Sequence, residues 1–250
     1  VKNVTGYDLS KLVTGSFGTL VALTEITLKV LPKKKLSNTI TINTDDKKLV
    51  NELFEKISSS SSDVSGAVFI AEEPKDASYD HNKEMVFKFN DLEHKGSFVA
   101  LRIEGDKISI DEKIKALTDE LELNKLDKTI LDVHQSTPFW KKINNLELFK
   151  QTKNNLLRVV IPPSKGTKLM QYLGNKYKYY IDWCGSLFWI EVQSKKNIKV
   201  GEIKNLIKEL GGYLTIIKTS NEYDYEETIF TENDTRLLIS EKIKKSFDPK

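Results

Sequence analysis

The feature that most constrains the fold is an order of strand-like and helix-like segments that occurs twice along the chain. Apolar residues alternate with polar ones in the strand-like segments and recur every three or four positions in the helix-like ones. Each occurrence, within residues 37–133 and 155–218, reads strand, helix, strand, strand, helix, strand. This order is typical of a ferredoxin-like βαββαβ unit, which forms an antiparallel sheet with helices on one face. The sequence therefore predicts an α+β fold containing two such units.

The periodicity also places the elements. In the first unit we expect strands at 37–43, 66–71, 97–104 and 126–133, and helices at 45–57 and 111–123. In the second we expect strands at 155–161, 177–183, 187–192 and 213–218, and helices at 164–173, capped by Ser164, and 200–210. Outside this pattern we expect a flexible serine loop at 58–62, a polar loop at 72–82, an extra strand at 84–89, a connecting helix at 138–143 and an amphipathic helix at 234–247.

Composition excludes several functional classes. The 250 residues carry a net charge of only +3, from 39 basic and 36 acidic side chains, which gives no case for nucleic-acid binding. No window approaches 18 consecutive apolar residues, so we expect no direct membrane insertion. Cys184 is the only cysteine, which rules out an internal disulfide and a cysteine-ligated cluster within this chain and fits a reducing, cytoplasmic setting.

The first 32 residues combine a short helix, a glycine turn and an alternating segment. Asp8 is placed to cap a helix over 9–13, Gly15 to follow that helix with a positive φ, and Gly18 to allow a close backbone approach. From Thr19 to Leu31 the alternation predicts a strand. Exposed N–H groups in such a turn suit a phosphate or a polar ring. On chemistry alone, an ordinary helix–turn–strand connection is the simpler interpretation.

The same segment reads N-x-x-G-Y-D-L-x-K-L-x-x-G-S-x-G-T-L-x-x-x-T-E-x-T-L-K-V-L-P. It resembles the end of the FAD-binding domain in the vanillyl-alcohol oxidase family of flavoproteins, also called p-cresol methylhydroxylase-type, and within it the FAD-binding subunits of glycolate oxidases. The family's usual glycine after Thr-Leu is Val21 here. The resemblance implies that FAD is bound by Gly6, Asp8, Gly15, Ser16, Phe17, Gly18, Thr19, Leu20, Val21, Ala22 and Leu23.

The resemblance extends thinly over the rest of the chain and implies a domain plan. Residues 1–32 would end an FAD-binding domain, 33–230 would form the FAD-linked oxidase cap domain that covers the flavin, and 231–250 would return toward the FAD domain. The weaker matches are Phe139-Trp140, residues 157–163, Ile181-Asp182-Trp183, Gly211-Gly212-Tyr213 and the final Phe247-Asp248-Pro249. We expect the 250 residues alone to bind FAD poorly and to be inactive, because the segment that holds the pyrophosphate lies upstream in the family.

For function, the resemblance implies hydride transfer from a small 2-hydroxy acid to FAD and electron transfer to an iron–sulfur subunit. Partners would be the FAD-linked catalytic subunit and the iron–sulfur subunit of a glycolate oxidase complex, cytoplasmic or peripheral at the inner membrane. Two alternatives stay open: a non-catalytic scaffold subunit of such a complex, or an oxidoreductase for another 2-hydroxy acid such as D-lactate.

Few residues stand out as candidates for catalysis or substrate binding, and the catalytic base is not identified. His134 follows a predicted strand and is a candidate acid–base group, whereas His81 and His94 fall in polar loops and form no metal-binding cluster. Arg158 and Arg102 each interrupt an apolar strand and are candidates for binding a carboxylate or for an ordinary ion pair. An aromatic group around one hairpin would line a pocket, or belong to the core or an interface: Tyr177, Tyr179, Tyr180, Trp183, Phe188 and Trp189.

Overall fold

The computed structural model describes residues 8–72, 74, 87–89, 92–94, 96–193, 197–220 and 234–248, with side chains left out at 87–94, 197–199 and 234. The chain divides into two compact units. One unit joins Val1–Pro32 to Glu232–Lys250, and the other comprises Lys33–Thr231. Each unit is described by itself.

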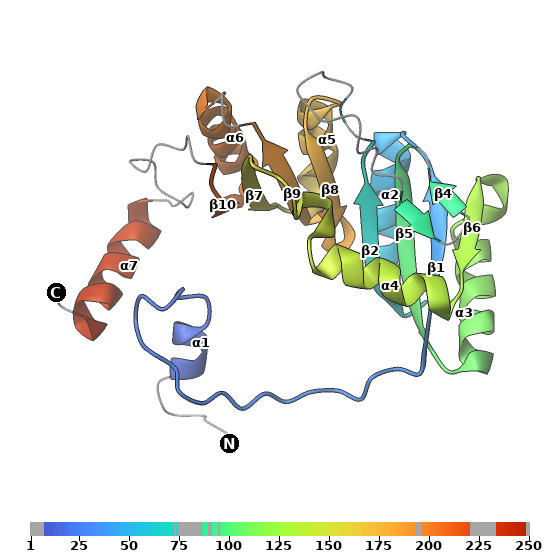
Figure 1. Ribbon diagram of the computed structural model, residues 1–250, viewed down its shortest axis with the longest axis horizontal. Helices are drawn as coiled ribbons and strands as arrows, with labels where there is room; N and C mark the ends of the chain where they lie inside the picture. Colours follow the sequence, from blue (N-terminus) through green and yellow to red (C-terminus); the bar gives the residue numbers. More distant parts are fainter. Residues whose placement is uncertain are drawn as a thin grey trace. The chain divides into compact units, whose positions relative to one another are not determined.

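The larger unit is built on an eight-stranded antiparallel sheet with strand order β10-β7-β9-β8-β2-β5-β1-β6 (Figure 1). Its first half comprises β1 (Leu36–Asn43), α2 (Lys47–Ser59), β2 (Val64–Ile70), β5 (Phe98–Gly105), α3 (Lys107–Glu120) and β6 (Lys128–Leu131). Its second half comprises β7 (Asn155–Val160), α5 (Gly166–Leu173), β8 (Lys178–Asp182), β9 (Leu187–Val192), α6 (Asn197–Glu209) and β10 (Tyr213–Lys218). Each half is a ferredoxin-like βαββαβ unit, so the predicted fold class is confirmed.

The two halves join edge to edge through their second strands. β2 and β8 pair antiparallel over two residue pairs, Phe69 with Ile181 and Ile70 with Tyr180. Within a half the ladders are longer; β1 and β5, for example, pair over eight residues, from Leu36–Gly105 to Asn43–Phe98. The result is one continuous sheet with a short seam at its centre.

The core lies mainly on the face of the sheet that carries α2, α3, α5 and α6. Alternate strand residues such as Ile40, Leu101, Leu157 and Ile190 point to this face and are fully buried, as the period of two requires. The helices contribute their apolar stripes, for example Leu53 of α2.

A fifth helix, α4 (Val133–Asn144), covers the opposite face of the first half (Figure 1). Phe139, Trp140 and Ile143 of α4 pack on Val68 and Phe98, in a second, smaller cluster. The 3-10 turn η3 (Glu147–Phe149) continues this cover as far as Tyr180 of β8, against which Phe149 stacks with ring centroids 5.7 Å apart. The part of this face formed by β7, β9 and β10 beyond η3 is called the open face below. Arg158 and Trp189 on it are half-buried and Tyr213 is exposed, whereas Leu156, Leu187, Glu191 and Thr215 are buried.

Several predicted boundaries are wrong. α4 begins at Val133 rather than 138, because Asp132 and Gln135 form a capping box, and α3 begins at Lys107 because Asp106 caps it. Ser164 caps nothing: it lies in the 3-10 turn η4 (Pro163–Lys165), which precedes α5.

The serine segment and the extra strand also differ from expectation. Ser58 and Ser59 belong to the last turn of α2, and the hydroxyls of Ser60 and Ser62 donate to Glu120 at 2.7 and 3.1 Å. Of the predicted extra strand at 84–89, the described part is β3 (Phe87–Phe89), which pairs with β4 (Leu92–His94) in a separate two-stranded ribbon. The predicted polar loop falls largely outside the described residues.

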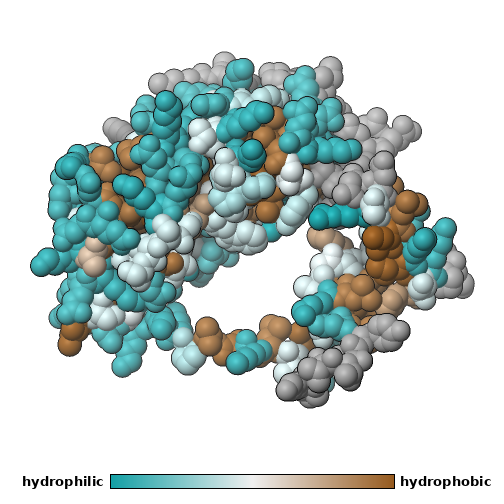
Figure 2. All heavy atoms as spheres, turned by 180° about the vertical axis from the view of Figure 1, so that it is seen from behind, coloured by the Kyte–Doolittle hydropathy of each residue, from teal (hydrophilic) through white to brown (hydrophobic). Residues whose placement is uncertain are grey.

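The smaller unit contains α1 (Leu9–Val13) and α7 (Asp234–Phe247), both predicted. The predicted strand from Thr19 to Leu31 is absent: among the described residues its backbone pairs with no other strand. Leu23, Ile26, Leu28, Val30 and Leu31 are 57–85% exposed. Figure 2 shows hydrophobic, brown atoms along the thin stretch of chain at the bottom of the view. The alternation is that of a strand, but a strand needs a neighbour to satisfy its N–H and C=O groups.

Candidate functional site

The glycine turn that follows α1 is open and depends on its glycines. Gly15 and Gly18 have φ values of +83° and +76°, and Phe17 between them has +52°. A Cβ at either glycine would meet no atom within 4 Å, so conformation rather than packing requires glycine here. Within the described part of the chain, the amides of Gly15 and Gly18 have no hydrogen-bond partner. Two backbone donors are therefore without a partner among the described residues, as a ligand site built from backbone needs.

The other residues expected to contact FAD are arranged less uniformly. Ser16 closes the turn, since its carbonyl accepts from the N–H and hydroxyl of Thr19 at 2.9 and 2.7 Å. The stretch from Leu20 to Leu23, with Val21 and Ala22, has no regular secondary structure and pairs with no strand within the described residues. Gly6 lies outside the described residues.

Asp8 has a structural role of its own. Its carboxylate accepts from the Lys11 N–H at 3.1 Å as the N-cap of α1 and pairs with the Lys11 ammonium at 2.9 Å. The hydrogen bond from the Lys11 side chain is the main cause that lowers the pKa of Asp8. Capping therefore explains Asp8 without a ligand.

Arg158 is the principal polar feature of the open face. It lies on β7, half-buried, between Trp189 of β9 and Thr215 of β10, its partners in register. Its guanidinium lies over the ring of Trp183, with Cζ 5.3 Å from the centroid. No carboxylate among the described residues pairs with it, so the ion-pair alternative is not realised there.

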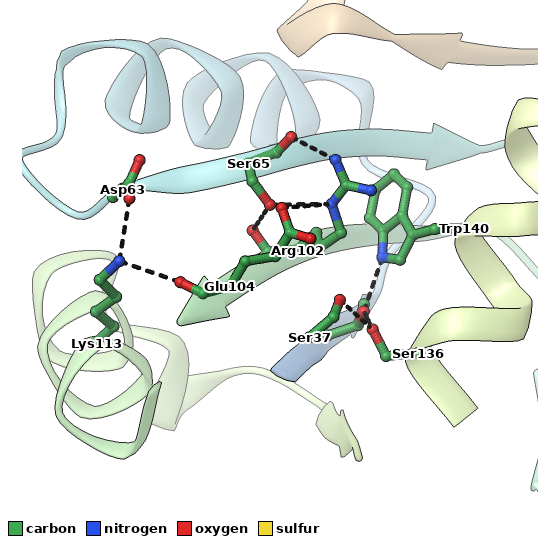
Figure 3. Close-up of polar contacts among 9 residues, drawn as sticks. Ser37, Asp63, Ser65, Arg102, Glu104, Lys113, Ser136 and Trp140 are labelled. Atoms are coloured by element: carbon green, nitrogen blue, oxygen red, sulfur yellow. Dashed lines mark hydrogen bonds and ion pairs between the residues drawn. The ribbon is translucent and has the colours of Figure 1, made fainter. Parts of the chain in front are cut away.

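Arg102, the second candidate, is already engaged (Figure 3). Its Nε and Nη2 donate to the Ser65 hydroxyl at 2.9 Å and the Ser65 carbonyl at 2.8 Å. Its guanidinium lies 4.9 Å from the Trp140 ring centroid, and Glu104 lies 3.6 Å from its Nε. Trp140 in turn donates from Nε1 to the Thr39 hydroxyl at 2.9 Å. Arg102 therefore secures α4 to the sheet, and of the two arginines Arg158 is the one left for a ligand.

The turn after β8 was only partly anticipated. It is the 3-10 turn η5 (Trp183–Gly185), in which Trp183, Cys184 and Gly185 have φ values of +52°, +50° and +91°. The Asp182 carboxylate accepts from the Trp183 N–H at 2.7 Å and stabilises the start of this turn. Burial raises the pKa of Asp182, and burial likewise raises the pKa of the Cys184 thiol. A sequence with neither glycine nor asparagine at 183 and 184 gives no signal of a left-handed turn.

The aromatic group divides between core and surface. Tyr177, Tyr179, Tyr180 and Phe188 are buried, and burial raises the pKa of both Tyr179 and Tyr180. Trp189 is half-buried and Trp183 is 55% exposed. The core interpretation therefore holds for four of the six, whereas Trp183 and Trp189 flank Arg158 on the open face.

The histidines provide no acid–base site that the structure can define. His134 does not end a strand: it is exposed in the first turn of α4, where its N–H donates to Asp132 at 2.9 Å. His94 belongs to β4 rather than to a loop, and His81 lies outside the described residues. Over the described ranges, no group of three His, Cys, Asp or Glu side chains is placed to hold a metal ion. Nor does any helix in those ranges have the length and apolar character to cross a membrane.

Comparisons with solved structures define the class of fold. The chain superposes on p-cresol methylhydroxylase with substrate bound, with a TM-score of 0.53 at 12% identity over 88% of this chain and 52% of that one. It matches alkyldihydroxyacetonephosphate synthase with a TM-score of 0.54 at 13% identity, over all of this chain and 49% of that one. The match to 4-ethylphenol oxidase from Gulosibacter chungangensis has a TM-score of 0.52 at 12% identity, over 86% of this chain and 52% of that one. The fold is that of the FAD-linked oxidases of the p-cresol methylhydroxylase type.

A curated relative is more specific. Glycolate oxidase subunit GlcE of Escherichia coli (strain K12) is 24% identical over 216 residues, covering 86% of this chain and 48% of that protein. The chain thus spans about half the length of the curated relative it matches, and no family model matches it. The resemblance inferred from residues 1–32 is confirmed by these comparisons.

Proposed function

We propose that this chain is part of the FAD-binding subunit of a glycolate oxidase complex that oxidises a small 2-hydroxy acid. The observation that carries the proposal is the glycine turn of a chain similar to GlcE: its open backbone donors at Gly15 and Gly18 lie in the segment that matches the flavin-binding sequence. The FAD-linked oxidase fold of the larger unit supports the same assignment. Electrons would pass to an iron–sulfur subunit, in a complex that is cytoplasmic or peripheral at the inner membrane.

The residues of the turn fit a flavin on geometry and donor chemistry. Both glycines leave room for a planar ring or a phosphate, and their amides supply two neutral donors without the need to displace a side chain. Val21 narrows the approach at one position, so contact there is expected from the backbone of the neighbouring residues instead. The flavin supplies the two-electron chemistry when bound, and the chain supplies its orientation.

Two alternatives have support of their own. Val21, which stands where the family usually has glycine, favours a scaffold subunit whose partner carries out the oxidation. The open face, with Arg158 as its charged group, suits any small 2-hydroxy acid, D-lactate included. Flavin binding separates the first alternative from the proposal, and substrate comparison separates the second.

The decisive experiment measures flavin on the full-length gene product, purified with its partner subunits. Gly18→Ala and Gly96→Ala form a matched pair: both glycines have positive φ, +76° and +92°, and both have free space around a new Cβ. Each change should therefore cost about 1 kcal/mol of backbone strain, but only Gly18→Ala should reduce the flavin-to-protein absorbance ratio. Equal flavin retention in both variants would remove the turn from the cofactor site. Flavin that glycolate and D-lactate leave oxidised would exclude both substrates.

A further inference from the structure

The guanidinium of Arg158 has no counterion among the described residues. It is half-buried on β7, which lies between β10 and β9 in the sheet. Removing a charge from water without a partner is unfavourable, so a folded chain normally neutralises such a group or keeps it in solvent. The guanidinium of Arg158, a planar fork of N–H donors, is therefore suited to bind an anion from outside the described part of the chain.

Trp183 supports the guanidinium from a strained backbone. Left-handed φ angles at Trp183 and Cys184 cost about 1 kcal/mol each for residues other than glycine. The hydrogen bond from Trp183 N–H to Asp182 and the burial of Gly185 against Phe54 hold the turn in this conformation. The indole is nevertheless 55% exposed, so core packing does not explain the strain. Strain of this kind gathers at binding sites, where it fixes a side chain in a required position.

The acidic groups near the open face are committed elsewhere. Glu191, on the same face of β9, is 5% exposed and accepts from the Thr152 hydroxyl and the Asn154 amide, both at 2.6 Å. Asp182 is bound to the backbone of η5. Neither of these carboxylates forms an ion pair with Arg158 within the described residues, so its guanidinium lies beside the indoles of Trp183 and Trp189 with its N–H donors available to a small anion.

We propose that Arg158 and Trp183 form a carboxylate-binding site, in which the guanidinium fork binds both oxygens of a small organic acid and the indole holds the fork flat. This inference rests on the proposed function and names the part of the 2-hydroxy acid that this chain recognises. Thr215, the register partner of Arg158 on β10, lies on the same face of the sheet and is 7% exposed. A carboxylate matches the fork because two parallel N–H···O bonds form at once.

The test uses the full-length subunit in its assembled complex, with oxalate as the probe. Oxalate carries carboxylates but no α-hydrogen, so calorimetry reports binding without turnover. Arg158→Gln should weaken oxalate binding about 10- to 100-fold, since hydrogen bonds to a charged group are lost, and should raise the KM for glycolate more than it lowers kcat. Arg158→Lys should fall between, because it keeps the charge and loses the fork. Lys168→Gln, on the exposed side of α5 behind the sheet, should change nothing.

A second variant guards against misfolding. Trp183→Gly removes the indole and also relieves the left-handed strain, so the fold should be at least as stable while oxalate binds about 3- to 30-fold more weakly. Unchanged oxalate binding in Arg158→Gln and Trp183→Gly would overturn the site and leave the flavin assignment standing. Conversely, a flavin-free wild-type protein that still needs Arg158 to bind oxalate would uphold the site and reject the proposed function.

Discussion

The indole of Trp140 fills the space above Gly66, and this contact yields a quantitative prediction. Trp140 is 5% exposed and donates to Thr39 at 2.9 Å. Trp140→Phe removes this hydrogen bond, worth about 1 kcal/mol, and leaves the Thr39 hydroxyl satisfied by Ser136 at 2.7 Å. The smaller ring also leaves a void that costs about 1–2 kcal/mol. Together with a weaker contact to Arg102, the free energy of unfolding should fall by about 3 kcal/mol.

Gly66→Ala tests the same contact from the other side. A Cβ at this position lies 3.1 Å from Cη2 and Cζ3 of Trp140 and 3.4 Å from Nε of Arg102, so the single variant should lose about 1 kcal/mol through overpacking. In the Trp140→Phe background the added methyl group enters the void. The double variant should therefore lose about 1 kcal/mol less free energy of unfolding than the sum of the losses of the two single variants. Urea unfolding of all four proteins, with equal m-values, measures this coupling. Additive losses, within about 0.3 kcal/mol, would refute this description of the contact.

Three further predictions concern other residues of the larger unit. Asp132→Ala removes the capping box of α4 and should lower the free energy of unfolding by about 1 kcal/mol in urea titrations, whereas Asp132→Asn should lose much less. Burial raises the pKa of Asp182 in the folded state, so the ionised carboxylate destabilises the fold above the folded-state pKa and has no effect below the pKa of the unfolded chain. Asp182→Asn, whose side-chain oxygen still accepts from Trp183 N–H, should therefore raise the urea midpoint at pH 7. The gain should vanish toward pH 3, where the wild-type carboxyl is protonated in both states. Because burial also raises the pKa of Cys184, iodoacetamide should label it more slowly at pH 8 in the native protein than in urea, and equal rates would contradict its burial.

The strand and helix order was predictable because each element of the larger unit carries its own period. Leu214 and Ile216 take alternate positions of β10 and both belong to the core, and Leu53 and Ile57 recur along α2, so local sequence and tertiary burial agree. The early start of α4 had a readable signal, since Asp132 followed by Gln135 is a capping box, but the polar residues 134–137 hide the helical period.

The site was predictable in part. The positive φ of Gly15 was predictable because glycine commonly follows a helix in this conformation, whereas the FAD contacts of Gly15 and Gly18 come from the family resemblance and stay a prediction. The sequence could not predict that Arg102 is engaged and Arg158 is left for a ligand, because the partners of Arg102 are Ser65 and Trp140, which lie far away in the sequence. The exposed, left-handed Trp183 was invisible for a related reason: strain imposed by tertiary contacts leaves no local pattern. The segment after Thr19 is the opposite case: its sequence has a clear strand pattern, but among the described residues no neighbouring strand pairs with it.

The two-pair seam between β2 and β8 also has a consequence for how the chain assembles. Each half closes its own ladders over neighbouring stretches of sequence, so each is able to form early, whereas the seam brings together residues more than a hundred positions apart. If the two halves of each chain fold before the seam forms, the β2 and β8 edges of one chain are able to pair with those of a second chain as well as with each other. An exchanged dimer, with β2 of one copy against β8 of the next, would therefore need no new contacts, and high protein concentration during refolding is the condition that favours it.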